Sequence, residues 1–186
     1  LNNYNLFSRE EIKESIKSIN AIRNHCILIV RKSSLPRNAK IDQSNIIWTS
    51  GIKTWKDLSN RGIWVNGTAD GMGENFDTNI ETLTMFPWVK LTHSDAPKSK
   101  IKNTIATYNL YELPIKEDIK NKKYFYWMSS SAFKYVKQKY PEIINANHSC
   151  GPGNTFEEIK KFIKDPNKLS IALSYKSWKE KLLNDS

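Results

Sequence analysis

The sequence predicts an α/β protein of two similar units, each built on a parallel sheet. One observation is an internal repeat: residues 46–76 contain IIWTSGIKTWKDL and GIWVNGTADGMGENF, and residues 125–162 contain FYWMSSSAFKYV and NHSCGPGNTFEEIKKF. Each copy reads as a strand, a hydroxyl-rich loop, a helix, a short segment and a glycine turn. The other observation is that predicted strands alternate with helices along the chain, which indicates parallel sheets. Ligands of such sheets bind at the carboxyl ends of the strands.

The first elements follow from capping and apolar spacing. Ser8 and Glu11 form a capping box, and isoleucines at near-helical spacing follow, so we expect a helix over residues 9–23. The wholly apolar run of residues 26–30 predicts a buried strand. Polar residues 36–44 predict a loop.

The middle of the chain carries most of the predicted strands. Residues 52–59 read as a short helix between two strand signals. Pro87 stands where proline is tolerated, at a strand start, and Pro114 ends the last strand of this region. The strands predicted here are residues 45–48, 62–65, 88–92 and 104–110.

The last third of the chain repeats the pattern. A charged connector leads to an aromatic strand, and a helix then ends before Pro141. The predicted elements are a connector at 115–123, strands at 124–128 and 169–173, a glycine turn at 149–153, and helices at 132–139, 155–164 and 175–183.

Composition excludes several classes of protein. The 186 residues carry 29 Lys and Arg against 19 Asp and Glu, a net charge of +10 that attracts anions such as nucleic acid, anionic lipid or a polycarboxylate. The lysines are dispersed, and no run of about 18 apolar residues could span a membrane. Two cysteines indicate a reducing compartment, here the cytoplasm, and the three histidines lack metal-site spacing. The segment GTADGMG lacks the GK[ST] of a P-loop.

The hydroxyl loops are the first candidate site. Residues 49–51 (Thr-Ser-Gly) and 129–131 (Ser-Ser-Ser) precede predicted helices, whose first N–H groups bind carboxylates or phosphates. The alternative is that these residues are only helix caps. Tyr111 stands at a strand end where the chain passes from one unit to the other, and its hydroxyl could act as a weak acid or hydrogen-bond donor.

The ordered set of motifs resembles the uroporphyrinogen-III synthase family. Residues 48–50 (Trp-Thr-Ser) are similar to that family's strand ending in F/W-T-S, and residues 67–69 resemble its Gly/Thr turn. The second copy is at residues 127–131, although Met128 replaces a threonine. Residues 150–155 resemble a G-P-T-T turn with one insertion, and Leu110-Tyr111 resembles the family's V-Y.

The resemblance implies two flavodoxin-like parallel-sheet domains, joined by a two-stranded hinge, with a cleft between them. We expect residues 1–40 plus 118–186 to form the first α/β domain and residues 41–117 the second. Sequences of the family begin with a strand like L-V-T-R-P, to which residues 27–31 (ILIVR) are only weakly similar. Part of the first domain is therefore expected to be missing, reshaped or supplied by preceding sequence.

Enzymes of this family close hydroxymethylbilane into uroporphyrinogen III, inverting ring D and losing water, in tetrapyrrole (haem) biosynthesis. The resemblance implies that no cofactor or metal takes part. It implies Tyr111 as the catalytic residue, assisting departure of the substrate hydroxyl. The substrate-binding residues that it implies are Thr49, Ser50, Gly51, Thr68, Ala69, Ser129, Ser130, Ser131, Gly151, Pro152 and Thr155.

The expected partner is the polycarboxylate tetrapyrrole, with the preceding pathway enzyme as a further candidate, and the expected state is a cytoplasmic monomer without nucleic-acid or membrane partners. Two alternatives stay open. One is an inactive synthase-like domain, or part of a fused tetrapyrrole enzyme, that binds an anionic ligand without turnover. The other is a basic nucleic-acid-binding α/β module, for which steeply salt-dependent binding is the discriminating observation.

Overall fold

The structure, a computed structural model, describes residues 3–69, 84–96 and 100–184. It confirms the predicted class, because strands alternate with helices and almost all strand pairs are parallel. No helix among these residues is both long enough and apolar enough to cross a membrane. The chain folds as two compact units: one is Phe7–Glu112, and the other combines Leu1–Leu6 with Leu113–Ser186.

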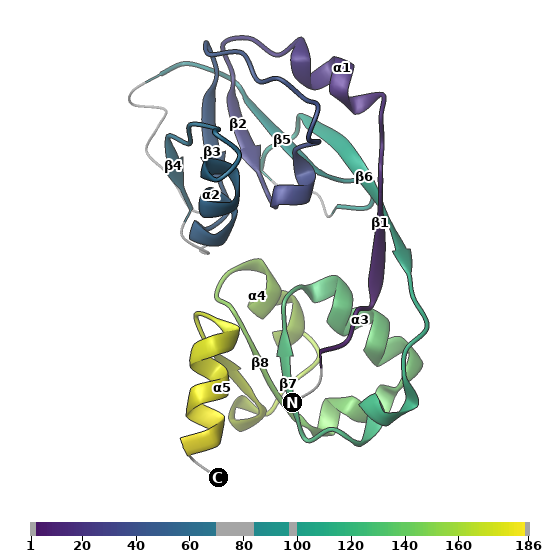
Figure 1. Ribbon diagram of the computed structural model, residues 1–186. Coiled ribbons are helices and arrows are strands. Elements are labelled where there is room, and N and C mark those ends of the chain that lie inside the picture. Colours follow the sequence, from purple (N-terminus) through teal and green to yellow (C-terminus); the bar gives the residue numbers. More distant parts are fainter. Residues whose placement is uncertain (1–2, 70–83, 97–99, 185–186) are drawn as a thin grey trace. The chain divides into compact units, whose positions relative to one another are not determined.

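The unit Phe7–Glu112 is built on a six-stranded sheet with the order β1-β6-β5-β2-β3-β4 (Figure 1). Every neighbouring pair is parallel except β1 and β6, which are antiparallel. The strands are β1 (Phe7–Glu11), β2 (Cys26–Ile29), β3 (Ile46–Thr49), β4 (Gly67–Thr68), β5 (Trp88–His93) and β6 (Thr104–Glu112). The helices are α1 (Ser15–Asn20), α2 (Ile52–Ser59) and the short 3-10 helix η1 (Lys32–Ser34).

One face of this sheet carries the core. Ile27 and Ile29 of β2 point to the same face, where they meet Ile47 of β3 and Val89 and Leu91 of β5. The same cluster includes residues of α1 and the turn after it, of the end of η1 and of α2, so these segments cover that face: Ile19, Ile22, Leu35 and Leu58. Burying each such side chain stabilises the fold by about 1.5–3 kcal/mol.

The predicted helix over residues 9–23 is wrong in its first half. Phe7–Glu11 form β1, which pairs antiparallel with β6, and the helix is limited to Ser15–Asn20. Ser8 therefore lies opposite Tyr111 in a ladder and caps no helix. The physical reason is that the free edge of β6 offers a row of backbone N–H and C=O groups, which β1 satisfies.

The strand predicted at residues 62–65 is also displaced. After α2 the chain turns at Gly62, whose φ of +76° is a left-handed conformation that favours glycine. The strand itself is Gly67–Thr68. Before it, the Ile47 N–H donates to the Asn66 side-chain oxygen at 2.8 Å, while the Asn66 N–H donates to the Ile47 carbonyl at 2.9 Å. The Asn66 side chain thus accepts a hydrogen bond that a backbone carbonyl would accept if β4 began earlier.

The unit boundaries differ from those expected. Residues 7–40 lie with residues 41–112, because β2 pairs directly with β3, and residues 113–117 lie in the other unit. The crossover from β2 to β3 consists of η1 and a loop where a flavodoxin-like unit would have a full helix. The two points where the chain changes unit are neighbours, since Phe7 pairs with Glu112 and the Leu113 N–H donates to the Leu6 carbonyl at 2.9 Å.

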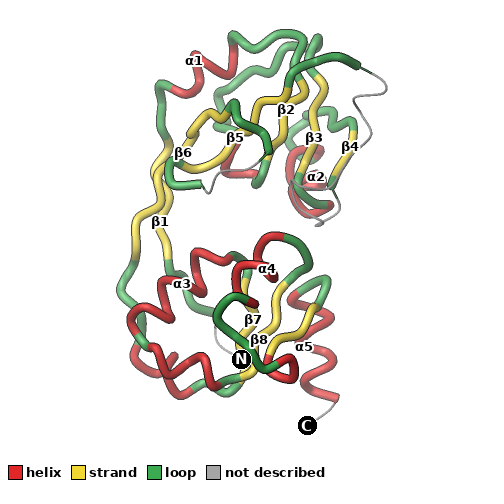
Figure 2. Tube along the Cα trace, turned by 180° about the vertical axis from the view of Figure 1, so that it is seen from behind, coloured by secondary structure: helices red, strands yellow, loops and turns green. Residues whose placement is uncertain are grey.

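The other unit has a three-stranded parallel sheet of order β7-β8-β9 (Figure 2). Its core combines buried Phe133, Val136 and Ile159 with stacked rings on the sheet. The strands and helices predicted with bounds in this region are confirmed, with ends shifted by a few residues: β7 (Tyr124–Trp127), β9 (Leu169–Ile171), α3 (Ser130–Lys139), α4 (Asn154–Lys160) and α5 (Tyr175–Asn184). The middle strand, β8 (Asn147–Cys150), takes in the first two residues of the predicted glycine turn at 149–153. Three 3-10 helices connect them: η3 (Glu117–Asn121), η4 (Pro141–Asn145) and η5 (Pro166–Lys168).

Candidate functional site

Two of the predicted loops meet at the carboxyl edge of the six-stranded sheet. Residues 49–51 end β3, and residues 68–69 end β4. Thr49 pairs with Thr68 in the parallel ladder, and the Ala69 N–H donates to the Thr49 carbonyl at 2.8 Å. The fold therefore brings these two loops together, as a site at strand ends requires.

The hydroxyls of the first loop are used within the fold. Thr49 is fully buried, and its hydroxyl donates to the Gly51 carbonyl at 3.4 Å. The Ser50 hydroxyl donates to the Val30 carbonyl at 2.5 Å, which ties the loop to the end of β2. At Gly51, the N-cap of α2, no described side chain caps the helix. What this loop offers an anion is therefore the backbone N–H groups of the first turn of α2.

The loops of the smaller sheet also share one edge. Ser129–Ser131 follow β7, and Gly151–Thr155 follow β8. Trp127 and Cys150, the last residues of the two strands, are paired in the ladder. All the implied binding residues of this unit therefore lie at the carboxyl ends of two neighbouring parallel strands.

These loops are also helix starts. Ser129 is the N-cap of α3, and its hydroxyl accepts a hydrogen bond from the Ala132 N–H at 3.3 Å, so for this serine the capping alternative is realised. The cap of α4 is Gly153, with a φ of +89°, and Thr155 lies inside the first turn. The left-handed backbone at Gly153 explains why glycine stands there.

Tyr111 lies on β6, about half exposed. Its hydroxyl is hydrogen-bonded to Glu10, and that bond together with the carboxylate charge raises the pKa of Tyr111. Strands β5 and β2 separate β6 from β3, which is about 14 Å across the sheet. The register places Thr49 level with Ile105 of β6, so Tyr111 also lies six residues further along the strand direction. Tyr111 therefore lies beyond the carboxyl edge that carries this loop, where, among the described strands, β6 pairs with β1 alone.

Sequence reasoning missed a basic and aromatic cluster at that edge. His93, at the end of β5, stacks on Tyr108 of β6 with ring centroids 5.8 Å apart. Burial is the main cause that lowers the pKa of His93, and the charges of Arg31 and Arg9 lower it further, while Asp95 raises it. Their positions in the sequence could have indicated this cluster, because Arg31 and His93 both directly follow predicted apolar strands, where ligands of parallel sheets bind.

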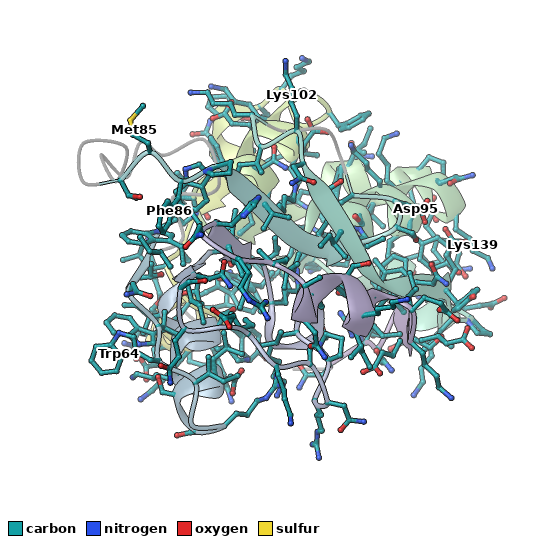
Figure 3. All side chains as sticks on the ribbon, turned by 90° about the horizontal axis from the view of Figure 1, so that it is seen from above. Trp64, Met85, Phe86, Asp95, Lys102 and Lys139 are labelled. Carbon is teal, nitrogen blue, oxygen red and sulfur yellow. The ribbon has the colours of Figure 1, made fainter. Side chains whose placement is uncertain are left out.

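The remaining residues considered are buried in a strand, lie on the exposed surface or fall outside the described residues. His148 and Cys150 are buried in β8, and burial raises the pKa of the Cys150 thiol to about 11, which makes it a poor nucleophile. Asp95 lies in the exposed loop after β5, while Trp64 projects from the surface of the same unit (Figure 3). The glycine turn at residues 70–73 lies outside the described residues.

Comparison with known proteins identifies the fold. No protein-family model matches the sequence, and no curated protein matches it. A crystal structure of a mutant uroporphyrinogen III synthase from the extremely thermophilic bacterium Thermus thermophilus matches with a TM-score of 0.61, covering 97% of this chain and 88% of that one at 9% identity. Another structure of the Thermus thermophilus enzyme matches with a TM-score of 0.48 at 8% identity, covering 95% and 85%. The chain therefore has the fold of uroporphyrinogen III synthase.

Proposed function

We propose that this protein is a uroporphyrinogen III synthase, which closes hydroxymethylbilane into uroporphyrinogen III with inversion of ring D and loss of water. The observation that carries the proposal is the fold likeness, because it extends over 97% of this chain and 88% of the solved synthase. The ordered motifs support it independently, since four of them stand at the carboxyl edges of the two sheets.

The electrostatics suit a polycarboxylate substrate. The net charge of +10 attracts it, and the start of α2, which no described side chain caps, presents N–H groups to a carboxylate. Ring closure without inversion competes spontaneously, so the main task of such an enzyme is to hold the substrate in one folded conformation. Many backbone contacts from loops at strand ends serve that task, and the proposal needs no cofactor.

In this proposal Tyr111 acts as a hydrogen-bond donor to the departing hydroxyl. A phenol is protonated at neutral pH, and the contact with Glu10 raises the pKa of Tyr111 further, so its hydroxyl can donate. Glu10 holds the hydroxyl on one side of the β1–β6 ladder before substrate binds. In the proposed step the Tyr111 hydroxyl would turn its hydrogen bond from Glu10 to the substrate oxygen.

A second candidate is a synthase-like protein that binds an anionic tetrapyrrole without turnover. The observation that favours it is that the hydroxyls of Thr49, Ser50 and Ser129 are all engaged within the fold. Binding would then depend on backbone N–H groups, without the hydroxyl contacts that the resemblance implies.

A coupled assay tests the proposal. Hydroxymethylbilane is generated in situ, the protein is added, and the oxidised porphyrin isomers are separated. Isomer III above the spontaneous isomer I background supports the synthase. Isomer I alone from a folded sample contradicts it, and saturable binding of uroporphyrin by that same sample would establish the second candidate.

A further inference from the structure

A basic pocket lies in the unit Phe7–Glu112, on the face covered by α2 and η1. Its volume is about 400 Å³, within the range of small-molecule sites. It is lined by β1, by η1 and the loop after it, by α2 with the turn that follows, and by Tyr108 of β6. The charged side chains in its wall are Arg9, Lys32, Arg37 and Arg61 against Glu11 and Asp57, four cations to two carboxylates.

Arg61 is fixed in place by the backbone of the opposite wall. Its guanidinium donates to the Leu35 carbonyl at 2.8 Å, the Pro36 carbonyl at 3.0 Å and the Lys32 carbonyl at 3.4 Å. Burial lowers the pKa of Arg61, and the neighbouring charge of Arg37 lowers it further. Arg37 and Arg61 both line the pocket, so two guanidinium groups share its wall, an arrangement that an anion between them would relieve.

The carboxylates of the wall compensate this charge only in part. Asp57 pairs with Lys32 at 3.9 Å. The ion pairs among the described residues include none with Arg9, Arg37 or Arg61. Arg9 and Arg37 therefore present guanidinium groups that can bind a phosphate or carboxylate through two parallel hydrogen bonds.

The pocket and Tyr111 lie on opposite faces of the β1–β6 ladder. Glu11 is directly opposite Tyr108, and Arg9 is opposite Leu110, so these side chains share the face of the pocket. Tyr111 is opposite Ser8, on the face that also carries Glu10. A ligand in the pocket would therefore not occupy the position of Tyr111.

We propose that this pocket binds a second ligand, a small metabolite that carries a phosphate or carboxylate group. The arginines bind the oxyanion. The pocket is larger than one such group, and Leu35, Pro36 and Tyr108 give it an apolar wall, so the ligand has a compact body that packs there. The proposal does not rest on the synthase activity.

Calorimetric titration with three probes tests it: inorganic phosphate, adenosine monophosphate and citrate. The variants are Arg37→Gln and Arg9→Gln. The control is Lys17→Gln on exposed α1, which removes one positive charge away from the pocket. We expect saturable binding of at least one probe, weakened about tenfold in each arginine variant and unchanged in the control.

Preference for adenosine monophosphate over citrate assigns a phosphate ligand, and the reverse assigns a carboxylate ligand. Absence of saturable binding by the wild-type protein overturns the proposal. Binding that falls equally in all three variants, or in none, also overturns it, because the charge of the whole surface or another site would then be responsible. The porphyrin-isomer assay on Arg37→Gln distinguishes the pocket proposal from the synthase proposal, because this variant should lose ligand binding in the pocket and retain any synthase activity.

Discussion

The indole of Trp127 donates a hydrogen bond to Nδ1 of His148 at 2.9 Å, between the adjacent strands β7 and β8. The other ring nitrogen of His148 lies 2.9 Å from the Ile143 carbonyl. Because Nδ1 accepts, Nε2 carries the proton and donates to that carbonyl. The buried imidazole is therefore neutral and bonded on both sides, which makes it a structural residue of the smaller sheet.

Acid should destabilise the protein through His148. Burial is the main cause that lowers its pKa from 6.5 to about 4. The unfolded chain then binds more protons, so this contribution to stability is present above pH 6.5 and is lost as the pH falls to about 4. We expect a loss of about 3 kcal/mol over this window, measured by urea denaturation at several pH values. His148→Gln should be less stable at pH 7 and show a flatter pH dependence; an unchanged slope would contradict the assignment.

Gly67 is required by the packing of Trp48. A Cβ at this position would lie 2.3 Å from carbon atoms of the indole ring. Gly67→Ala should therefore lower the free energy of unfolding by about 1–3 kcal/mol, because the ring must move. Gly151→Ala is the matched control, since nothing lies within 4 Å of a Cβ there. Equal stability of the two variants in chemical denaturation would refute the packing argument.

Ser50 should matter more for stability than for substrate binding. Its hydroxyl donates to the Val30 carbonyl, so Ser50→Ala should cost about 1 kcal/mol of unfolding free energy. If the loop binds an anion through backbone N–H groups, the Kd for a porphyrin ligand should change less than about threefold once the protein is folded. Ser59→Ala serves as the control, because this serine is exposed at the end of α2 and is not among the implied binding residues. A large loss of affinity without loss of stability would show that the Ser50 hydroxyl itself contacts the ligand.

Tyr111→Phe should slow isomer III formation by about a hundredfold if the hydroxyl assists the departing group. Folding should be unaffected, because the side chain is about half exposed. Wild-type turnover in this variant would remove Tyr111 from the proposed mechanism.

Glu10→Gln tests the contact between these two side chains directly. The bond to Glu10 and its charge raise the pKa of Tyr111, so the amide should let this pKa fall toward its ordinary value. A difference ultraviolet titration of the tyrosines, with Tyr111→Phe subtracted, reports the shift. The same titration curve in both proteins would mean that Glu10 does not contact the hydroxyl in solution.

The sequence alone determined the elements whose signals are local. The predicted bounds of the helix Ile52–Ser59 are exact, and those of the buried strand Cys26–Ile29 differ by one residue. Both elements are specified locally, by the spacing of apolar residues and by the turn residues that flank them. The placement of the hydroxyl and glycine loops at strand ends followed from the same signals, and the fold class followed from the alternation of strands and helices.

Only the tertiary structure decided what depends on pairing between distant residues. The capping box at Ser8 predicted a helix, but pairing with Tyr111 made the segment a strand, since satisfying the edge of β6 outweighs a local cap. Pairing of β2 with β3 likewise moved the unit boundary. Strand order brought His93 beside Tyr108, and the tertiary fold brought Arg37 and Arg61 into the wall of one pocket; no local pattern specifies either.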